Sequence, residues 1–122
     1  KISKKIKIIG VTTLTSLDNN DLKEIGYNKS TKNLVIHQAK LAKKANLDGL
    51  VCSVHEVKYV RKFFKKEIIT PGIRFNTSKN DQKRSATPYE AFNKYKSDWL
   101  VVGRSLTKGN IKKNLRNLIS QI

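Results

Sequence analysis

The sequence has a single cysteine, no long apolar run and few acidic residues. Cys52 has no second cysteine to pair with, so an internal disulfide is excluded and a reducing cytoplasm is expected. No stretch approaches the roughly 18 apolar residues that a membrane-spanning helix needs. The basic segment 1–7 leads into a short apolar run and lacks the long apolar region and the cleavage site of a signal peptide. These absences predict a soluble, cytoplasmic protein without a membrane span.

Metal-ligand patterns are also lacking. His37 and His55 are the two histidines, and no cluster of cysteines or acidic residues stands at ligand spacing from them. We therefore expect no metal site. Cys52 and Ser53 are interpreted as buried packing residues at the end of a strand, with no role as nucleophiles.

Acidic residues are scarce relative to basic ones. Lys and Arg number 26 against nine Asp and Glu, which gives a formal net charge of +17. Such a charge invites a nucleic-acid interpretation. However, the aromatic platforms and Arg-rich segments of RNA-binding modules are missing. The charge is spread along the chain in separate pairs, namely Lys4–Lys5, Lys43–Lys44, Lys65–Lys66, Lys83–Arg84 and Lys112–Lys113. Solvated surface is the favoured interpretation, and a basic, ribosome-associated nucleic-acid-binding protein is the alternative.

Short β-rich runs alternate with helical patterns, which predicts strand–helix units around a parallel sheet. The predicted strands are 7–14, 49–53, 67–70 and 99–102, and the predicted helices are 18–25, 30–46, 55–65, 87–96 and 110–122. At 122 residues the chain is long enough for one domain with a core but too short for a complete eight-stranded barrel. Periodicity alone leaves open whether the four units form an open sheet or half of a closed barrel.

Three further expectations concern burial and order. The continuous apolar run 7–14 is typical of a strand that is covered on both faces. The stretch 75–86 is polar and without periodicity, so it is predicted to be a mobile loop. The last helix is expected to bury its apolar positions, which are Ile111, Leu115, Leu118, Ile119 and Ile122.

Polar and glycine-rich residues follow each predicted strand, at the end where α/β folds hold their ligands. They are Thr15–Ser16, Ser53, the segment 71–74 and the segment 103–105. The last two segments carry Arg74 and Arg104. Gly72 and Gly103 precede these arginines and allow backbone amides to approach an anion. Because a guanidinium group can bond two phosphate oxygens at once, the pattern predicts a phosphate site. Either arginine could instead pair with a nearby carboxylate.

Five short segments, taken in order, resemble the orotidine 5′-phosphate decarboxylase family. They are VTTLTS at 11–16, LDGLVCS at 47–53, TPGIR at 70–74, DQKR followed by TP at 81–88, and VVGRSLT at 101–107. The resemblance covers nearly the whole chain, from the fifth strand of that barrel to its end. It implies a TIM (β/α)8 barrel, of which residues 1–122 supply the C-terminal four βα units as one partial domain.

The resemblance also implies an activity and roles for individual residues. The family converts orotidine monophosphate to UMP and CO2 in pyrimidine biosynthesis, as a lyase without a cofactor. Thr15 is expected to contact the pyrimidine or the ribose. Arg74, Arg104 and the backbone of Gly103 are expected to bind the phosphate. Gln82, on a loop that closes over the ligand, is expected to reach both phosphate and base.

The catalytic centre of that family is not in this sequence. It rests on an Asp-x-Lys-x-x-Asp segment, and Asp21-Leu22-Lys23 resembles it only superficially because Gly26 stands where the second Asp belongs. We therefore expect no catalytic residue in this chain and no activity from the chain alone. Since the sheet would have open edges and the family enzyme is a homodimer, a partner is expected, either an N-terminal half or another copy.

Overall fold

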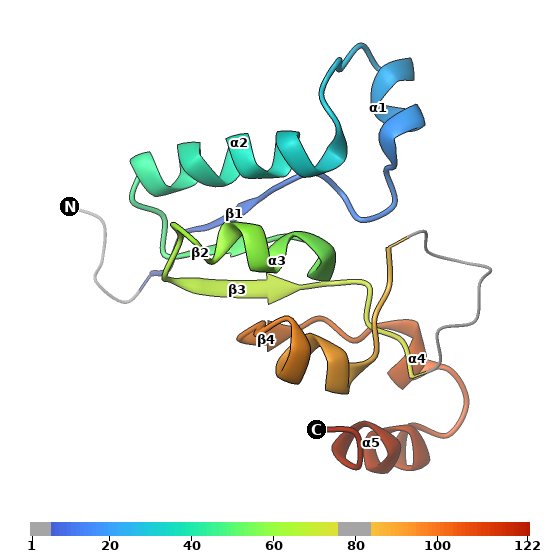
Figure 1. The fold of residues 1–122 in the computed structure, drawn as a ribbon. Helices are drawn as coiled ribbons and strands as arrows, with labels where there is room; N and C mark the ends of the chain where they lie inside the picture. The colour runs from blue at the N-terminus through green and yellow to red at the C-terminus, as the bar shows by residue number, and fades with distance from the viewer. Residues whose placement is uncertain (1–5, 76–83) are drawn as a thin grey trace.

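The computed structural model describes residues 6–75 and 84–122. Their strands form one four-stranded sheet in the order β1-β2-β3-β4, and all neighbours are parallel (Figure 1). The strands are β1 (Ile9–Val11), β2 (Gly49–Val51), β3 (Glu67–Thr70) and β4 (Trp99–Leu100). The predicted parallel sheet is confirmed. β3 has its predicted bounds, whereas the other three strands are shorter than predicted.

Helices connect the strands, as the alternating pattern predicts. After β1 come α1 (Asn19–Glu24) and α2 (Thr31–Lys44), and α3 (Val54–Val60) joins β2 to β3. The predicted helix 87–96 is a single turn of π-helix, η1 (Glu90–Lys94), and β4 is followed by α4 (Arg104–Thr107) and α5 (Ile111–Ile119). α4 was not predicted, since none of the predicted helices covers Arg104 to Thr107.

Side-chain caps fix where two of these segments begin. The Ser30 hydroxyl accepts a hydrogen bond from the backbone N–H of Asn33 at 3.3 Å, so Ser30 is the N-cap of α2. The carboxylate of Glu90 accepts from the Thr87 backbone N–H at 3.0 Å and from its hydroxyl at 3.1 Å. These hydrogen bonds, the backbone one above all, lower the pKa of Glu90. The predicted start of a helical segment at Thr87 is therefore confirmed, although that segment is short.

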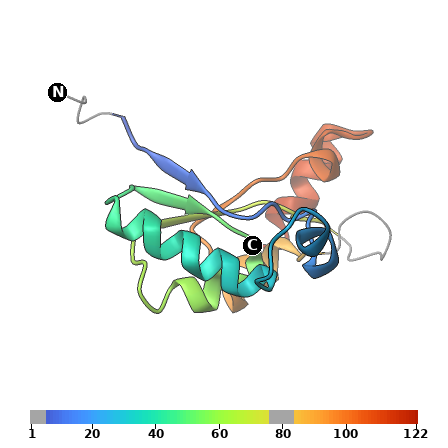
Figure 2. The same ribbon diagram turned by 90° about the horizontal axis from the view of Figure 1, so that it is seen from above.

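The core lies between the sheet and the layer formed by α2 and α3, which cover one face (Figure 2). Leu50 and Ile68 point from the sheet into this layer and are at most 1% exposed. Burying aliphatic side chains of this size contributes about 1.5–3 kcal/mol each. The main cluster comprises Val35, Ala39, Ala42, Leu50, Cys52, Val57, Val60, Phe64 and Ile68.

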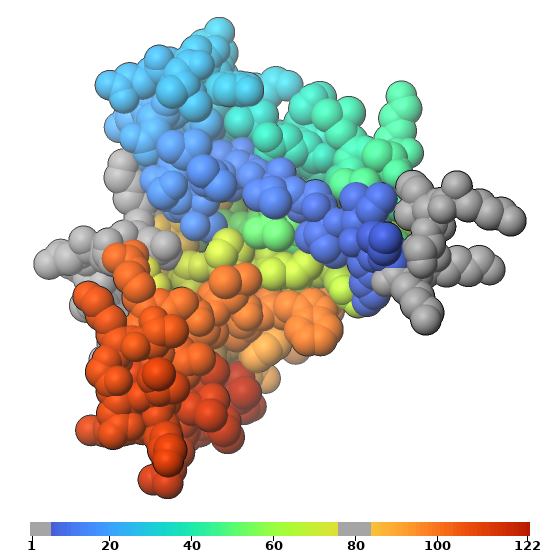
Figure 3. All heavy atoms as spheres, turned by 180° about the vertical axis from the view of Figure 1, so that it is seen from behind, coloured from blue at the N-terminus to red at the C-terminus, as the bar shows by residue number. Residues whose placement is uncertain are grey.

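The other face of the sheet is open in the described part of the chain, and Figure 3 looks onto it. Val11 is 65% exposed, Trp99 56% and Val101 50%. The prediction that the first strand is covered on both faces is therefore wrong. An apolar run shows that both faces of a strand are suited to burial, but it does not show that this chain buries both.

The apolar stripe of α5 is exposed as well. Ile111 is 55% exposed, Leu115 45% and Ile119 60%, so the predicted burial of this helix is wrong; Ile122 is 61% exposed and only Leu118 is half-buried. Contact with α4 holds α5 in place, since the Asn114 side-chain amide donates to the carbonyls of Leu106 at 3.0 Å and Lys108 at 2.7 Å. Across residues 6–75 and 84–122, no helix is long and apolar enough to cross a membrane.

Candidate functional site

The segments that follow the strands gather at one end of the sheet. In Figure 1 this is the end toward which β3 points, where α1 and α4 also lie. Thr70 pairs with Leu100 across the β3–β4 boundary. Arg74 and Arg104 each stand four residues beyond this pair along their own segments. The two arginines therefore follow adjacent parallel strands at the same sequence offset, on the side of the sheet where α/β folds bind ligands.

A cavity of about 220 Å³ opens at the same end of the sheet. Thr15 lines it, and so does Pro71, which directly follows β3. Its other lining residues are Val11, Thr12, Thr13, Leu14, Ser16, Val51 and Cys52. The cavity is below the roughly 300 Å³ at which small-molecule pockets usually begin. Neither Arg74 nor Arg104 is among its lining residues in the described chain, so this cavity holds Thr15 without the arginines.

The backbone at Arg74 is fixed by pairing with a distant segment. The Arg74 N–H donates to the carbonyl of Ala86 at 3.0 Å, next to an isolated parallel bridge between Ile73 and Ala86. Gly72 has a φ of +80°, a conformation that favours glycine, and it starts this turn. The Arg74 side chain is half-buried, and its Nη1 donates to the carbonyl of Ile73 at 3.4 Å. Since Ala86 is buried and paired, the predicted mobile loop 75–86 is wrong at its C-terminal end.

Gly103 and Arg104 begin α4. The Gly103 carbonyl accepts from the backbone N–H of Leu106 at 2.9 Å and of Thr107 at 3.2 Å. Its φ is −93°, and a Cβ at this position would meet no atom within 4 Å. Space therefore remains beside this backbone for another molecule. The Arg104 side chain is exposed. Gln82 lies outside the described residues.

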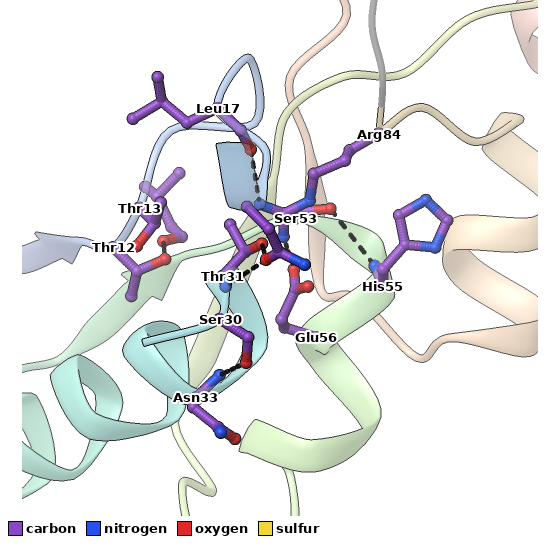
Figure 4. A network of polar contacts seen from close by, with 12 residues as sticks. Thr12, Thr13, Leu17, Ser30, Thr31, Asn33, Ser53, His55, Glu56 and Arg84 are labelled. Carbon is purple, nitrogen blue, oxygen red and sulfur yellow. Dashed lines mark hydrogen bonds and ion pairs between the residues drawn. The ribbon is translucent and has the colours of Figure 1, made fainter. Parts of the chain in front are cut away.

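A buried ion pair that sequence reasoning missed lies beside these segments (Figure 4). The Arg84 guanidinium binds the carboxylate of Glu56 on α3, and the two residues are only 8% and 5% exposed. Arg84 Nη1 also donates to the carbonyl of Leu17, in the segment after β1, at 3.5 Å. The pair therefore ties together the segments that follow β1, β2 and β3. The only sequence signal was the position of Arg84 in the DQKR motif, which did not reveal its burial.

Two threonine hydroxyl groups that line the cavity form hydrogen bonds within the chain. The Thr13 N–H and hydroxyl donate to the side-chain oxygen of Gln38 at 2.9 and 3.0 Å, and the Thr12 hydroxyl donates to the carbonyl of Val51 at 2.8 Å. Ser53 is the N-cap of α3 and is fully buried. Burial raises the pKa of the Cys52 thiol to about 12. Cys52 and Ser53 are buried at the end of β2, as predicted, and Ser53 also caps α3. A thiol with so high a pKa is not a nucleophile at neutral pH.

The Asp21-Leu22-Lys23 segment lies within α1, whose N-cap is Asp18. The Asp18 side chain accepts from the Asp21 N–H at 3.0 Å, and the Asp21 carboxylate accepts from the Asp18 N–H at 2.7 Å, which is a capping box at the start of α1. Leu22 is buried and Lys23 is exposed. Where the chain is described, no group of three His, Cys, Asp or Glu residues is placed to hold a metal ion.

A parallel sheet with helices on one face, an open second face and polar residues after each strand defines the class as part of an α/β barrel. The family model for "Orotidine 5'-phosphate decarboxylase / HUMPS family" matches residues 2–116. The chain belongs to this family.

Relatives and solved structures agree with this assignment. The chain is 52% identical over 109 residues to orotidine 5′-phosphate decarboxylase from Wolbachia pipientis subsp. Culex pipiens (strain wPip), covering 88% of this chain and 48% of that protein. It is 46% identical over 110 residues to the Coxiella burnetii (strain RSA 493 / Nine Mile phase I) enzyme, covering 88% and 46%. The crystal structure of orotidine 5′-phosphate decarboxylase from Lactobacillus acidophilus superimposes with a TM-score of 0.74 at 30% identity, covering 94% of this chain and 48% of that one. The chain thus spans about half the length of the curated relatives that it matches.

Proposed function

We propose that this chain is the phosphate-binding half of an orotidine 5′-phosphate decarboxylase, a lyase that forms UMP and CO2 from orotidine monophosphate. The single observation that carries the proposal is the pairing of Thr70 with Leu100. It sets Arg74 and Arg104 at equal offsets beyond adjacent strands, where two guanidinium groups can share one phosphate dianion. Charge-assisted bonds of this kind are about twice as strong as neutral ones.

The remaining site residues take the roles that the family resemblance implies. Thr15 contacts the pyrimidine or the ribose, and its place in the cavity after β1 supports this role. The Gly103 N–H donates to the phosphate, and the open space beside Gly103 supports this assignment. Gln82 reaches phosphate and base from its loop. The reaction uses no metal or organic cofactor.

The chain alone is inactive in this proposal. Decarboxylation of this kind demands about 20 kcal/mol of barrier lowering, which comes mainly from preorganised charges around the reacting carbon. The Asp-x-Lys-x-x-Asp segment that supplies those charges in the family does not occur in this sequence. Phosphate-binding arginines supply remote binding energy, which accelerates the reaction only where a reactive centre uses it.

Residues 1–122 are therefore one partial domain that works with a partner in the cytoplasm. The partner is an N-terminal half or another copy, and the complete enzyme is a homodimer. The open face around Val11, Trp99 and Val101 supports the need for a partner, since these side chains are at least half exposed. Contact with a second set of strands would bury this face and pair the free edges of β1 and β4.

Reconstitution tests the proposal. The chain is produced with the N-terminal half of the Wolbachia relative, and decarboxylation of orotidine monophosphate is followed by the release of CO2. The chain alone, the N-terminal half alone and a complex carrying Arg104→Ala are the controls. Activity of the complex only is expected. Full activity of the isolated chain, or a soluble complex that neither binds UMP nor decarboxylates, contradicts the proposal.

A further inference from the structure

The fold brings together two lysine pairs that are separate in the sequence. Lys43 lies near the end of α2, Lys65 and Lys66 lie beyond the end of α3, and all three line one cavity of about 310 Å³. A second, more open depression of about 450 Å³ is lined by Lys40, Lys43, Lys44 and Phe63. Lys43 and Phe63 line both, so the two are continuous. We call this surface the basic groove and define it by Lys40, Lys43, Lys44, Phe63, Lys65 and Lys66.

Positive charge in the basic groove is largely uncompensated. Asp48 is 3.8 Å from Lys66, and it is the one carboxylate that the described chain places within ion-pair distance of a groove lysine. Lys65 and Lys66 are oriented by backbone carbonyls, Lys65 by Arg61 at 2.7 Å and Lys66 by Asn46 at 3.1 Å. Lys40, Lys43 and Lys44 make no hydrogen bond or ion pair to the described residues and are exposed, so they are available to an external anion.

Aromatic rings are set among these lysines. Phe63 is half-buried and packs against the main core cluster, so its ring is held in place while part of it faces the groove. Four residues earlier, the Tyr59 ring lies 3.9 Å from the Lys32 amine of α2, measured to the ring centroid. Hydrogen bonding to Lys58 and then to Lys32 lowers the pKa of the Tyr59 hydroxyl. A second ring, that of Tyr59, therefore also lies beside a cation where α2 packs against α3.

This combination fits one kind of partner. Single-stranded nucleic acids are bound by a positive groove that follows the phosphates and by aromatic rings on which bases stack. A membrane surface would instead require a row of exposed apolar side chains, and the groove offers one half-buried ring. We propose that the basic groove binds single-stranded nucleic acid, with Lys40, Lys43 and Lys44 on phosphates and Phe63 stacked on a base. The groove lies at the amino ends of the strands, away from the candidate phosphate site, so this proposal does not depend on the proposed enzyme function.

The test measures binding of the full chain to fluorescein-labelled oligo-dT and oligo-rU of about 15 nucleotides by fluorescence anisotropy. The groove variant is Lys40→Gln, Lys43→Gln and Lys44→Gln combined. The control variant is Lys108→Gln, Lys112→Gln and Lys113→Gln combined, which removes the same charge from exposed positions around α5. Phe63→Leu removes the ring but keeps an apolar side chain against the core. Thermal unfolding confirms that each variant is folded.

The wild-type chain should lose at least about tenfold in affinity between about 50 mM and 200 mM salt. The groove variant should bind about tenfold more weakly at the lower salt, and its salt slope should fall by about 2, whereas the control variant should change by less than about threefold. Phe63→Leu should weaken the binding of single strands about fivefold or more and leave the binding of duplexes unchanged. Tighter binding of oligo-rU would indicate RNA as the natural ligand, and tighter binding of oligo-dT would indicate DNA. Equal binding of the two would support recognition of the phosphates and bases that they share.

Three results would overturn the proposal. Equal weakening by the groove and control variants would mean that only total charge matters. Duplexes bound as tightly as single strands, with no effect of Phe63→Leu, would remove the stacking role. Binding to vesicles of anionic lipid without binding to either oligonucleotide would replace nucleic acid with a membrane.

Discussion

Arg84 and Glu56 form an ion pair in which both residues are buried, with exposed fractions of 8% and 5%. The pair joins α3 to the segment that leads into η1, and the bond from Arg84 to the Leu17 carbonyl adds the segment after β1. Ser16, which precedes Leu17, lines the cavity in which Thr15 lies, and so does Cys52, which lies two residues before α3. One guanidinium group therefore contacts both α3 and the segment after β1.

Replacing one partner of this pair is expected to destabilise the chain strongly. Arg84→Met leaves the Glu56 carboxylate buried without its counter-ion, which should lower the free energy of unfolding by about 3–5 kcal/mol. The double variant Arg84→Met, Glu56→Leu should recover most of this loss, since a buried pair is often replaceable by apolar groups. Urea unfolding followed by circular dichroism measures both. A single variant as stable as the wild type would show that the pair is not buried in solution.

The Cys52 thiol provides a test at alkaline pH. Its pKa is raised to about 12 by burial, while the pKa of a thiol in the unfolded chain is about 9.0. Above pH 9 the unfolded state loses this proton and the folded state keeps it, so the stability supplied by the neutral thiol falls as pH rises from about 9 to 12. The slope is at most about 1.4 kcal/mol per pH unit. Cys52→Ala should remove this part of the pH dependence.

Alkylation gives a second measure of the same group. Native chain at pH 8 should react with iodoacetamide far more slowly than chain unfolded in urea, because the folded thiol is both buried and protonated. Equal rates in the two states would show that Cys52 is accessible.

A buried hydroxyl pair connects β3 to the segment before β4. The Thr70 and Ser97 hydroxyls lie 2.7 Å apart, and the two residues are 0% and 6% exposed. Ser97→Ala leaves the Thr70 hydroxyl without this partner and should cost about 1–3 kcal/mol. Thr70→Val combined with Ser97→Ala should cost less than Ser97→Ala alone, and the difference between their urea midpoints checks this. A more severe loss in the double variant would contradict the hydrogen-bond account.

Periodicity predicted the parallel sheet and most helices because those signals are local. It could not predict what covers an apolar face, since a side chain such as Val11 or Ile119 is equally apolar whether it is buried or exposed. Both were expected to be buried and are at least 60% exposed. The decisive information is which surfaces meet, and that information is not contained in the spacing of residues.

The candidate site was predictable only in part. Arg74 and Arg104 stand out because they follow glycine-containing turns after strands, and the sheet register places them at matching offsets. Arg84 looked like one more basic residue in a polar stretch, and its burial depends on Glu56, which is 28 residues away along the chain. A long-range charge pair of this kind leaves no periodic signal. The roles of Thr15 and Gln82 came from the family resemblance alone.

Trp99 reports on the open face, since it is the single tryptophan of the chain and is 56% exposed. Adding the N-terminal half of a relative should bury its ring against the opposite strands. The emission maximum should shift to shorter wavelength, and quenching by acrylamide should weaken. An unrelated protein of similar charge is the control. Unchanged emission in a complex that forms would place the contact elsewhere.

Arg104→Lys separates charge from geometry at the phosphate site. Lysine keeps the positive charge but loses the planar fork that bonds two oxygens. In the reconstituted complex, Arg104→Ala should weaken UMP binding by about 1.5–3 kcal/mol, and Arg104→Lys should recover only part of this loss. Calorimetric titration with UMP measures both. Full recovery by lysine would indicate a point-charge contact.

The most direct measurement is a double-mutant cycle on UMP binding to the reconstituted complex, with uridine as the ligand that lacks phosphate. Arg74→Ala and Arg104→Ala should each weaken the binding of UMP but leave the binding of uridine unchanged. Because both groups are proposed to bind one dianion, their effects should be coupled by about 0.5–3 kcal/mol. Strictly additive losses, or equal losses for UMP and uridine, would contradict a shared phosphate site.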